Sequence, residues 1–438
     1  MPMSRPSDLA GWLAYLETLH PKAIEMGLAR VREVAARLPA RVGCPTITVS
    51  GTNGKGSTCA MIETVLRCAG YRVGLYASPH LLRYNERVRI AGVVASDCEL
   101  VDAFNAVEDA RTAGTTIPLT YFEFGTLAAL WLFARANVDA LVLEVGLGGR
   151  LDAVNIVDAD VAIVTNVDLD HQDYLGPTRE AIGREKAGIF RAGRPAICGD
   201  RDPPRSLVEY AREQNAPLYR LGADFDAVDE GSQWRYRGPA GERFGLPMPA
   251  LRGRHQLGNA ATALAALDLM RDRLPISGGA VREALVGVEL PGRFQVLPGR
   301  PTIVLDVAHN PHAARVLAAT LGDMGFHPET HAVFGMLADK DLRGVIDALR
   351  SRVDRWHVAP LPGPRGASAQ QLVDHLRAAG VPDADIRRYD SIDAAFRGAR
   401  NAIGEADRMI VFGSFLTVAA ALAAHRPAPI GTKQTSHG

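Results

Sequence analysis

The sequence predicts an α/β protein with mostly parallel sheets and more than one domain. Short β-branched runs alternate with longer amphipathic segments, which is typical of parallel sheets covered by helices. The chain has 438 residues, more than the size at which a single hydrophobic core keeps growing. In addition, the glycine-rich stretch SGTNGKGST at 50–58 lies between a β-branched run and an apolar helical run. That arrangement is typical of a strand that turns into a helix around a phosphate group.

The first elements surround this glycine-rich stretch. TITVS at 46–50 predicts a strand, a helix begins near Lys55, and RVGLYAS at 72–78 predicts the next strand. The stretch 78–92 contains a glycine and many charges, so we expect a long exposed loop there.

The alternation continues through the middle of the chain. Helices are expected near Val101 and from about Phe122 to Arg135. The apolar runs VDALVLEVG at 138–146 and DVAIVTNV at 160–167 then predict two fully buried strands.

A further helix is expected over 177–190, where Pro177 suits a first helical turn. RPAICGD at 194–200 predicts another strand. Between 216 and 251 the chain becomes glycine-rich and loses strong periodicity, so short strands and turns are expected before a long helix over 258–270.

The best domain boundary is VELPGRFQVLPGRP at 288–301, because its prolines and glycines interrupt any regular element. We therefore expect a larger P-loop-type domain with a mostly parallel sheet at 1–296 and a smaller Rossmann-like α/β domain at 297–425. Residues 426–438 are expected to form a disordered tail. Strands of the smaller domain are predicted in TIVLDVAHNP, HAVFG, RWHVAP and RMIVFGS.

The charge balance, the length of the apolar runs and the cysteine pattern argue against several classes of function. Forty-nine basic residues balance forty-nine acidic ones, so no global field favours a nucleic-acid partner. Apolar runs fall short of the roughly 20 residues needed to span a bilayer, and no signal segment is recognised, so we expect a cytoplasmic protein with no membrane partner. Five cysteines without a CxxC pair indicate neither a disulfide framework nor a thiolate zinc site.

The stretch 50–58 departs from the usual phosphate loop, GxxxxGK[ST], in two places. Val49 stands where the first glycine belongs, and Gly56 intervenes between Lys55 and the hydroxyl pair Ser57 and Thr58. The match is therefore either accidental or the sign of a distinct nucleotide loop.

Two polar residues, Glu144 and His171, are expected to close the two buried strands. In open α/β sheets ligands collect beyond the carboxyl ends of the strands, and the stretch 50–58 lies at the same edge. The hydroxyl of Ser57, a carboxylate and an imidazole would then converge on a magnesium ion bound to nucleotide phosphates. The alternative is that Glu144 and His171 are ordinary polar groups bonded to loop amides.

Motifs along the chain resemble those of the bacterial folylpolyglutamate synthase and dihydrofolate synthase family, which belongs to the Mur-like ATP-dependent amide ligases. The resemblance rests on TVSGTNGKGST, YASPHLLRYNERVRI, LTYFEFGTLAALW, LEVGLGGRLDAVNIVDAD, LDHQDYLG, REKAGIFR, DVAHNP and FGMLADKD. It extends from about Trp12 to FGSFLTVAAAL, and the family's own phosphate loop resembles TNGKG[ST], so the two departures are expected ones.

The resemblance implies an ATP-dependent ligase that adds L-glutamate to dihydropteroate and to the γ-carboxylate of reduced folates. The carboxylate of the substrate would attack the γ-phosphate of ATP, and the amine of glutamate would then displace phosphate. Because two anions must meet, cations and in-line positioning supply the catalysis. We expect these small molecules to be the partners of a chain that acts as a monomer.

The resemblance also assigns a metal site and catalytic residues. Ser57, Glu144 and His171 would hold one Mg²⁺ ion. Lys186 would carry a carbamate derived from CO2, which would bind a second Mg²⁺. Since only a neutral amine reacts with CO2, burial or neighbouring cations must lower the pKa of Lys186. The expected catalytic residues are Lys55, Lys186 and His309.

The remaining matches concern ATP and the pterin, with ATP expected in the cleft between the domains. The expected ATP-binding residues are Asn53, Gly54, Lys55, Gly56, Ser57, Thr58, Asn259, Arg293 and Asp306. The expected pterin-binding residues are Thr120, Tyr121, Phe122, Glu123, Leu151, Asp152 and Ala153.

Several of these residues have structural alternatives. Phe122 suits a core position, Asp152 a turn and Asn259 a helix cap, while Arg293 suits an exposed surface and AHNP a turn. Ser414 and the FGMLADKD loop are weaker candidates near the glutamate and receive no role.

Two rival functions remain. One is a Mur-type ligase that adds an amino acid to a cell-wall nucleotide precursor, against which LTYFEFGT and REKAGIFR favour folate. The other is a P-loop switch that hydrolyses nucleotide without ligation, which predicts no second substrate.

Overall fold

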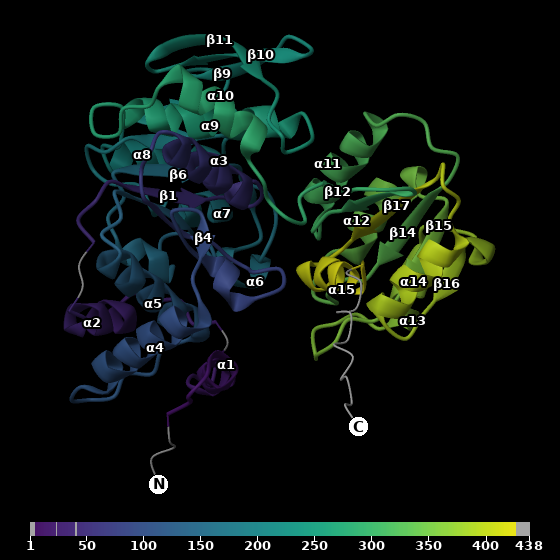
Figure 1. Ribbon diagram of the computed structural model, residues 1–438, viewed down its shortest axis with the longest axis horizontal. Helices are drawn as coiled ribbons and strands as arrows, with labels where there is room; N and C mark the ends of the chain where they lie inside the picture. The colour runs from purple at the N-terminus through teal and green to yellow at the C-terminus, as the bar shows by residue number, and fades with distance from the viewer. Residues whose placement is uncertain (1–4, 23, 40–41, 426–438) are drawn as a thin grey trace, which may run out of the picture. The chain divides into compact units, whose positions relative to one another are not determined.

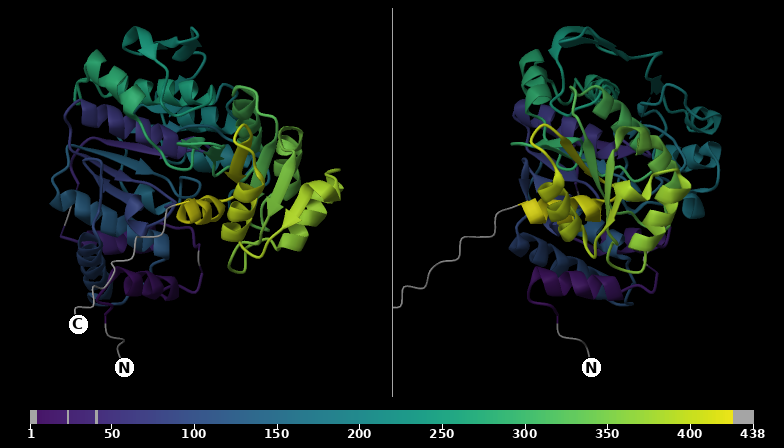
Figure 2. Two further views of the ribbon diagram at one scale, coloured as in Figure 1. Left: turned by 45° about the vertical axis from the view of Figure 1, so that its right-hand side comes forward. Right: turned by 90° about the vertical axis from the view of Figure 1, so that its right-hand side faces the viewer.

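A computed structural model describes residues 5–22, 24–39 and 42–425 of the chain. The chain divides into two compact units, residues 1–290 and 291–438, and Figures 1 and 2 show the elements of both. The tail expected to be disordered, 426–438, lies outside the described residues.

The larger unit is built on an eight-stranded, mostly parallel sheet, as the sequence predicts. The central strands run parallel, and β3 and β4 add an antiparallel edge. In spatial order the strands are β4 (Val93–Val94), β3 (Val88–Ile90), β2 (Val73–Tyr76), β5 (Ala140–Glu144), β1 (Thr46–Ser50), β6 (Val161–Val164), β7 (Ala196–Cys198) and β8 (Leu218–Arg220).

Helices cover both faces of this sheet because the side chains of each strand alternate between them. In β5, Val142 packs on one face and Leu143 on the other. The first face carries α3 (Lys55–Cys68), α9 (His255–Leu269) and α10 (Gly278–Gly287). The second carries α4 (Asp97–Thr112), α5 (Tyr121–Arg135), α7 (Arg179–Ala187) and α8 (Arg205–Glu213). Helices α1 (Leu9–Thr18) and α2 (Ala29–Arg37) pack against α4 and α5.

A small antiparallel sheet lies outside α9, as Figure 1 shows. It consists of β9 (Asp226–Asp229), β10 (Gln233–Gly238) and β11 (Gly241–Pro247). Trp234 and Tyr236 of β10 are fully buried in the same core as α3 and α9. The short strands expected between 216 and 251 are thereby confirmed.

The smaller unit is a six-stranded sheet with helices around it. Apart from β12, which is antiparallel, neighbouring strands run parallel. In spatial order the strands are β12 (Gln295–Leu297), β13 (Thr302–Leu305), β17 (Arg408–Phe412), β14 (Thr330–Phe334), β15 (Arg355–Val358) and β16 (Ile386–Arg388). The helices are α11 (Pro311–Gly322), α12 (Leu342–Leu349), α13 (Ala369–Ala378), α14 (Ile392–Ala402) and α15 (Phe415–His425).

Three local expectations were wrong. The stretch 78–92 is not an exposed loop, since it forms a short 3-10 helix (Tyr84–Arg87) and β3, and Tyr84 is buried in the core. Pro177 precedes the helix rather than opening it, because Thr178 is the N-cap of α7.

The stretch 288–301 also contains a regular element, because 295–297 form β12 and pair with β13. The boundary expected between 296 and 297 therefore falls within a strand of the smaller sheet.

Within the described residues, none of the helices combines the length and the apolar character needed to cross a bilayer.

Candidate functional site

The glycine-rich loop connects β1 to α3 at the carboxyl edge of the larger sheet, as expected. Gly51 and Gly54 have φ of +147° and +83°, values that side-chain-bearing residues rarely adopt. A Cβ at Gly51 would lie 1.8 Å from Thr165 Oγ1, and one at Gly54 would lie 2.8 Å from Asn259 Oδ1. The loop therefore requires glycine at both positions.

Contacts with the residues that follow the neighbouring strand β6 hold the loop in place. The Asn53 amide donates to Asn166 Oδ1 at 2.9 Å, and Thr165 Oγ1 donates to the Asn53 carbonyl at 2.6 Å. The Lys55 ammonium donates to the carbonyls of Gly51 and Thr52 at 3.0 and 3.2 Å. Because the N-terminus of a helix favours negative charge, this loop suits an anion at the start of α3.

The two hydroxyls after Lys55 have different environments. Ser57 Oγ accepts a hydrogen bond from Gln256 Nε2 at 3.4 Å. Thr58 Oγ1 is buried and has no hydrogen-bond partner. Ser57 is therefore the better candidate for a ligand, whereas the Thr58 side chain is part of the core.

Glu144 closes β5, and its carboxylate lies beside the loop. A Cβ at Gly56 would lie 3.9 Å from both carboxylate oxygens, and Oε2 accepts the backbone N–H of Ser78 at 3.2 Å. The carboxyl ends of β1, β2 and β5 thus meet here.

His171 does not close a strand, so that expectation was wrong. Strand β6 ends at Val164, and His171 is the N-cap of α6 (Gln172–Leu175) with φ of +52°. Its ring is 38% exposed and lies 3.9 Å from Asp170 Oδ1. Residues 165–170 separate His171 from the end of β6. The position of the imidazole therefore depends on the conformation of this connecting segment.

Lys186 is buried on α7, with 4% of its surface exposed. Burial, and secondarily the charge of Lys55, lowers its pKa to about 7, while Asp170 and Asp152 oppose the shift. A substantial share of this amine is therefore neutral near pH 7. That is the condition a carbamate requires.

The two segments expected to bind the pterin lie next to each other, because α5 contacts the short 3-10 helix Ala153–Ile156. The ring of Phe122 packs against Gly146, where a Cβ would lie 2.6 Å from the ring, and stands 5.8 Å from the ring of Tyr76. Thr120 and Glu123 form the capping box that begins α5, and Glu123 also pairs with Arg30 at 3.0 Å. The side chains of Thr120 and Glu123 therefore stabilise the start of α5, whether or not they also bind a pterin.

Asp152 holds the glycine loop that follows β5. Its carboxylate accepts the N–H groups of Leu147 and Val154 at 2.8 and 3.0 Å. Burial raises the pKa of Asp152 to about 7 even though these donors lower it. Ala153 is buried beside it, and the carbonyl of Leu151 accepts from Gly27 at 3.4 Å.

The remaining expected residues lie in the smaller unit and cluster there. The Asp306 carboxylate accepts the N–H groups of Phe294 and Ala308 at 2.9 and 2.8 Å, and burial raises its pKa against the charge of Arg293. The Arg293 guanidinium and the His309 ring lie 5.4 and 6.3 Å from the ring of Phe415.

Three residues at the larger sheet's edge were not predicted from the sequence. Ser78 follows β2 and Asn166 follows β6, so the strand-end rule that selected Glu144 would have found both. Gln256 precedes Asn259 by three residues, the spacing that places two side chains on one helix face.

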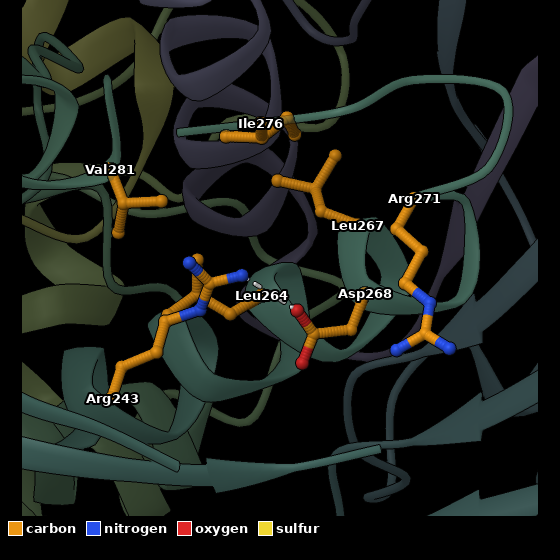
Figure 3. Close-up of a pocket in the computed structure, with 7 residues that line it drawn as sticks. All are labelled: Arg243, Leu264, Leu267, Asp268, Arg271, Ile276 and Val281. Carbon is orange, nitrogen blue, oxygen red and sulfur yellow. Dashed lines mark hydrogen bonds and ion pairs between the residues drawn. The ribbon is translucent and has the colours of Figure 1, made fainter. Parts of the chain in front are cut away.

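Figure 3 shows a pocket away from this edge, between α9, α10 and the small antiparallel sheet. Its volume of about 30 Å³ is far below the several hundred Å³ of a typical ligand site. The charged groups of Arg243 and Asp268, which line the pocket, pair with each other at 2.9 Å. We therefore regard this pocket as a small gap in the packing rather than as the substrate-binding site.

Comparison with protein families defines the class. Residues 49–267 match the model described as Mur ligase middle domain, and residues 292–415 match the one described as Mur ligase, glutamate ligase domain. The fold is thus that of a Mur-type ligase.

Comparison with individual proteins shows which Mur-type ligases the chain is similar to. The chain is 47% identical to the dihydrofolate synthase/folylpolyglutamate synthase of Escherichia coli K12, over 94% of each chain. It matches a structure of E. coli FolC in complex with DHPP and ADP with a TM-score of 0.89 and 47% identity, over 95% of this chain and 97% of that one. A bifunctional folylpolyglutamate synthase/dihydrofolate synthase with Mn, AMPPNP and L-glutamate bound gives a TM-score of 0.88 and 49% identity, over 95% and 98%.

The chain therefore belongs to the dihydrofolate synthase/folylpolyglutamate synthase family, and it is an ATP-dependent ligase.

Proposed function

We propose that the chain uses ATP to join L-glutamate to dihydropteroate and to the γ-carboxylate of reduced folates, through an acyl phosphate. The observation that carries the proposal is the meeting of the Lys55 loop, Glu144 and buried Lys186 at one sheet edge, in a chain similar to these synthases over nearly its whole length.

The loop binds and orients the polyphosphate in this proposal. The amides at the start of α3 and the Lys55 ammonium neutralise the phosphates, so that the anionic carboxylate can approach them in line. Asn259 contributes from α9. From the smaller unit, Arg293 and Asp306 contribute to nucleotide binding and His309 to catalysis.

The residues at this edge fit a magnesium ion. Among the residues that the structure describes, no three His, Cys, Asp or Glu side chains are placed to hold a metal. Mg²⁺ bound to nucleotide needs only one or two protein oxygens because it keeps several waters. Ser57 and Glu144 supply them in this proposal, with His171 nearby. The ion would supply charge neutralisation of the phosphates.

Lys186 extends this donor set if it carries a carbamate. Its lowered pKa supports the reaction with CO2, which converts a buried amine into an anionic oxygen ligand for a second Mg²⁺. Tyr121 and Phe122, with Thr120 and Glu123 at the start of α5, would bind the pterin together with 151–153. We further propose that the chain acts as a cytoplasmic monomer.

Phosphate release from ATP tests the proposal when dihydropteroate and glutamate are omitted in turn. A ligase needs both for sustained turnover, whereas a nucleotide switch needs neither. Mass analysis of products from dihydropteroate and from tetrahydrofolate then separates the two synthase activities. Turnover only with a cell-wall nucleotide precursor would overturn the folate assignment.

A further inference from the structure

A pair of amide side chains at the start of α9 reaches toward the phosphate loop. Gln256 and Asn259 lie three residues apart on one helix face, and Asn259 Nδ2 donates to Gln256 Oε1 at 2.8 Å. That bond sets the orientation of the Gln256 amide, so its NH2 group faces the other way. There, Nε2 donates to Ser57 Oγ at 3.4 Å.

Because Gln256 and Ser57 are both buried, the loss of a hydrogen bond between them should be costly. Gln256 is 3% exposed and Ser57 is 4% exposed, and a buried amide that loses its hydrogen-bond partner destabilises the protein because water cannot replace that partner. Neighbouring Thr58 shows that a hydroxyl in this turn can be left without a partner. Ser57 instead accepts from Gln256, which uses one of its lone pairs and leaves the other lone pair and the hydrogen for a ligand.

The other end of the amide chain lies beside the residue at which the loop passes into α3. Asn259 Oδ1 is 2.8 Å from the position that a Cβ would occupy at Gly54, the left-handed glycine that caps α3. Helices α3 and α9 also share one hydrophobic core, in which Ile62 and Ala263 are fully buried. The two amides therefore contact Gly54 and Ser57, on either side of the point where α3 begins, and link them to a neighbouring helix.

We propose that Gln256 is a positioning residue for nucleotide binding, which holds the Ser57 hydroxyl and the Asn259 amide in their working orientations. The inference rests on the proposed function of the loop. Gln256 acts through these two side chains, and supporting residues of this kind change metal or ligand affinity by about 10- to 100-fold.

Isothermal titration with Mg²⁺ and AMPPNP tests this role in the full chain. Gln256→Leu keeps the side-chain volume but removes both hydrogen bonds, so we expect about 10-fold weaker nucleotide binding with unchanged binding of dihydropteroate. Because part of the effect of Gln256 passes through Ser57, the double variant Gln256→Leu/Ser57→Ala should lose less affinity than the sum of the two single losses. A merely structural role predicts additive losses and weaker binding of both substrates.

Thr262→Val serves as the matched control, because the Thr262 hydroxyl is also on α9 but donates to Gly258 of its own helix at 2.8 Å. It should leave nucleotide binding unchanged. If the leucine variant fails to fold, the same titration is made with Gln256→Glu. Its carboxylate cannot donate to Ser57 and adds a negative charge beside the phosphates, so nucleotide binding should again be weaker. Nucleotide binding within twofold of the wild type in the folded variant overturns the inference. A wild-type chain that fails to bind AMPPNP overturns the proposed function instead.

Discussion

The carboxylate of Glu144 accepts the backbone N–H of Ser78 at 3.2 Å, although 66 residues separate the two in the chain. The contact joins the carboxyl ends of β5 and β2 next to the start of α3. It fixes the carboxylate on the side where the loop amides face a ligand.

Glu144→Gln removes the negative charge of this side chain but keeps an oxygen that can accept the Ser78 N–H. The amide oxygen can still accept from Ser78, so the melting temperature should change little. Loss of the negative charge should lower kcat at least 100-fold, which is the scale of a single preorganised electrostatic group. A variant with normal kcat at saturating Mg²⁺ would remove Glu144 from the metal site.

Lys55→Ala should abolish turnover while the fold stays intact. The ammonium donates to the loop carbonyls of Gly51 and Thr52 at 3.0 and 3.2 Å, and the helix it begins is held by the buried core of α3. Steady-state rates and circular dichroism check both halves of the prediction. Wild-type rates would contradict the assignment of the phosphate loop.

Lys186→Ala should reduce turnover at least 100-fold, and short carboxylates such as formate or acetate should restore part of it. The physical reason is that the carboxylate can occupy the space of the carbamate and supply the same oxygens. Lys186→Arg is the matched control, because a guanidinium forms no carbamate and leaves no space for the added acid. Equal stimulation of both variants would count against the carbamate.

Asp152→Asn should raise KM for the folate substrate more than KM for ATP. An asparagine has a single acceptor oxygen, so either Leu147 or Val154 loses its partner, at a cost of about 1–3 kcal/mol. The glycine loop against which Phe122 packs would then shift. Parallel KM measurements for the two substrates check the prediction, and an equal rise in both would point to a general loss of structure.

Acid should destabilise the smaller unit through His357. Its Nδ1 lies 3.1 Å from the Tyr389 hydroxyl and its Nε2 lies 3.2 Å from His331 Nδ1. Burial, then the charges of His331 and Arg387, lowers the pKa of His357 from 6.5 to about 4.

The sign of the effect follows from this lowered pKa. Below pH 6.5 the unfolded chain binds the proton first, so the free energy of unfolding should fall by up to about 3 kcal/mol between pH 6.5 and 4 and then level off. Denaturant titrations at several pH values measure this loss. It should be smaller in His357→Phe, and an identical pH dependence in both proteins would exclude His357 as the source.

Much of the fold follows from local patterns in the sequence. The β-branched run at 46–50 and the apolar run at 140–144 are both buried in a parallel sheet, as the sequence predicts. Stretch 78–92 was predicted wrongly, because its charges suggest exposure while Tyr84 inserts into a core built by α4 and α5. Local polarity does not report which distant helices cover a segment.

What the sequence determined by itself is the chemistry available: a glycine loop whose backbone needs φ above zero, a lysine at the helix start and a carboxylate at a strand end. Each depends on neighbouring residues alone. Only the tertiary structure decided that Ser78 meets Glu144, that Gln256 reaches Ser57, that His171 lies beyond its strand, and that Lys186 is buried near Lys55. Strand order and helix packing bring these residues together, and the pKa of an amine depends on the water and charges removed around it, which no local pattern encodes.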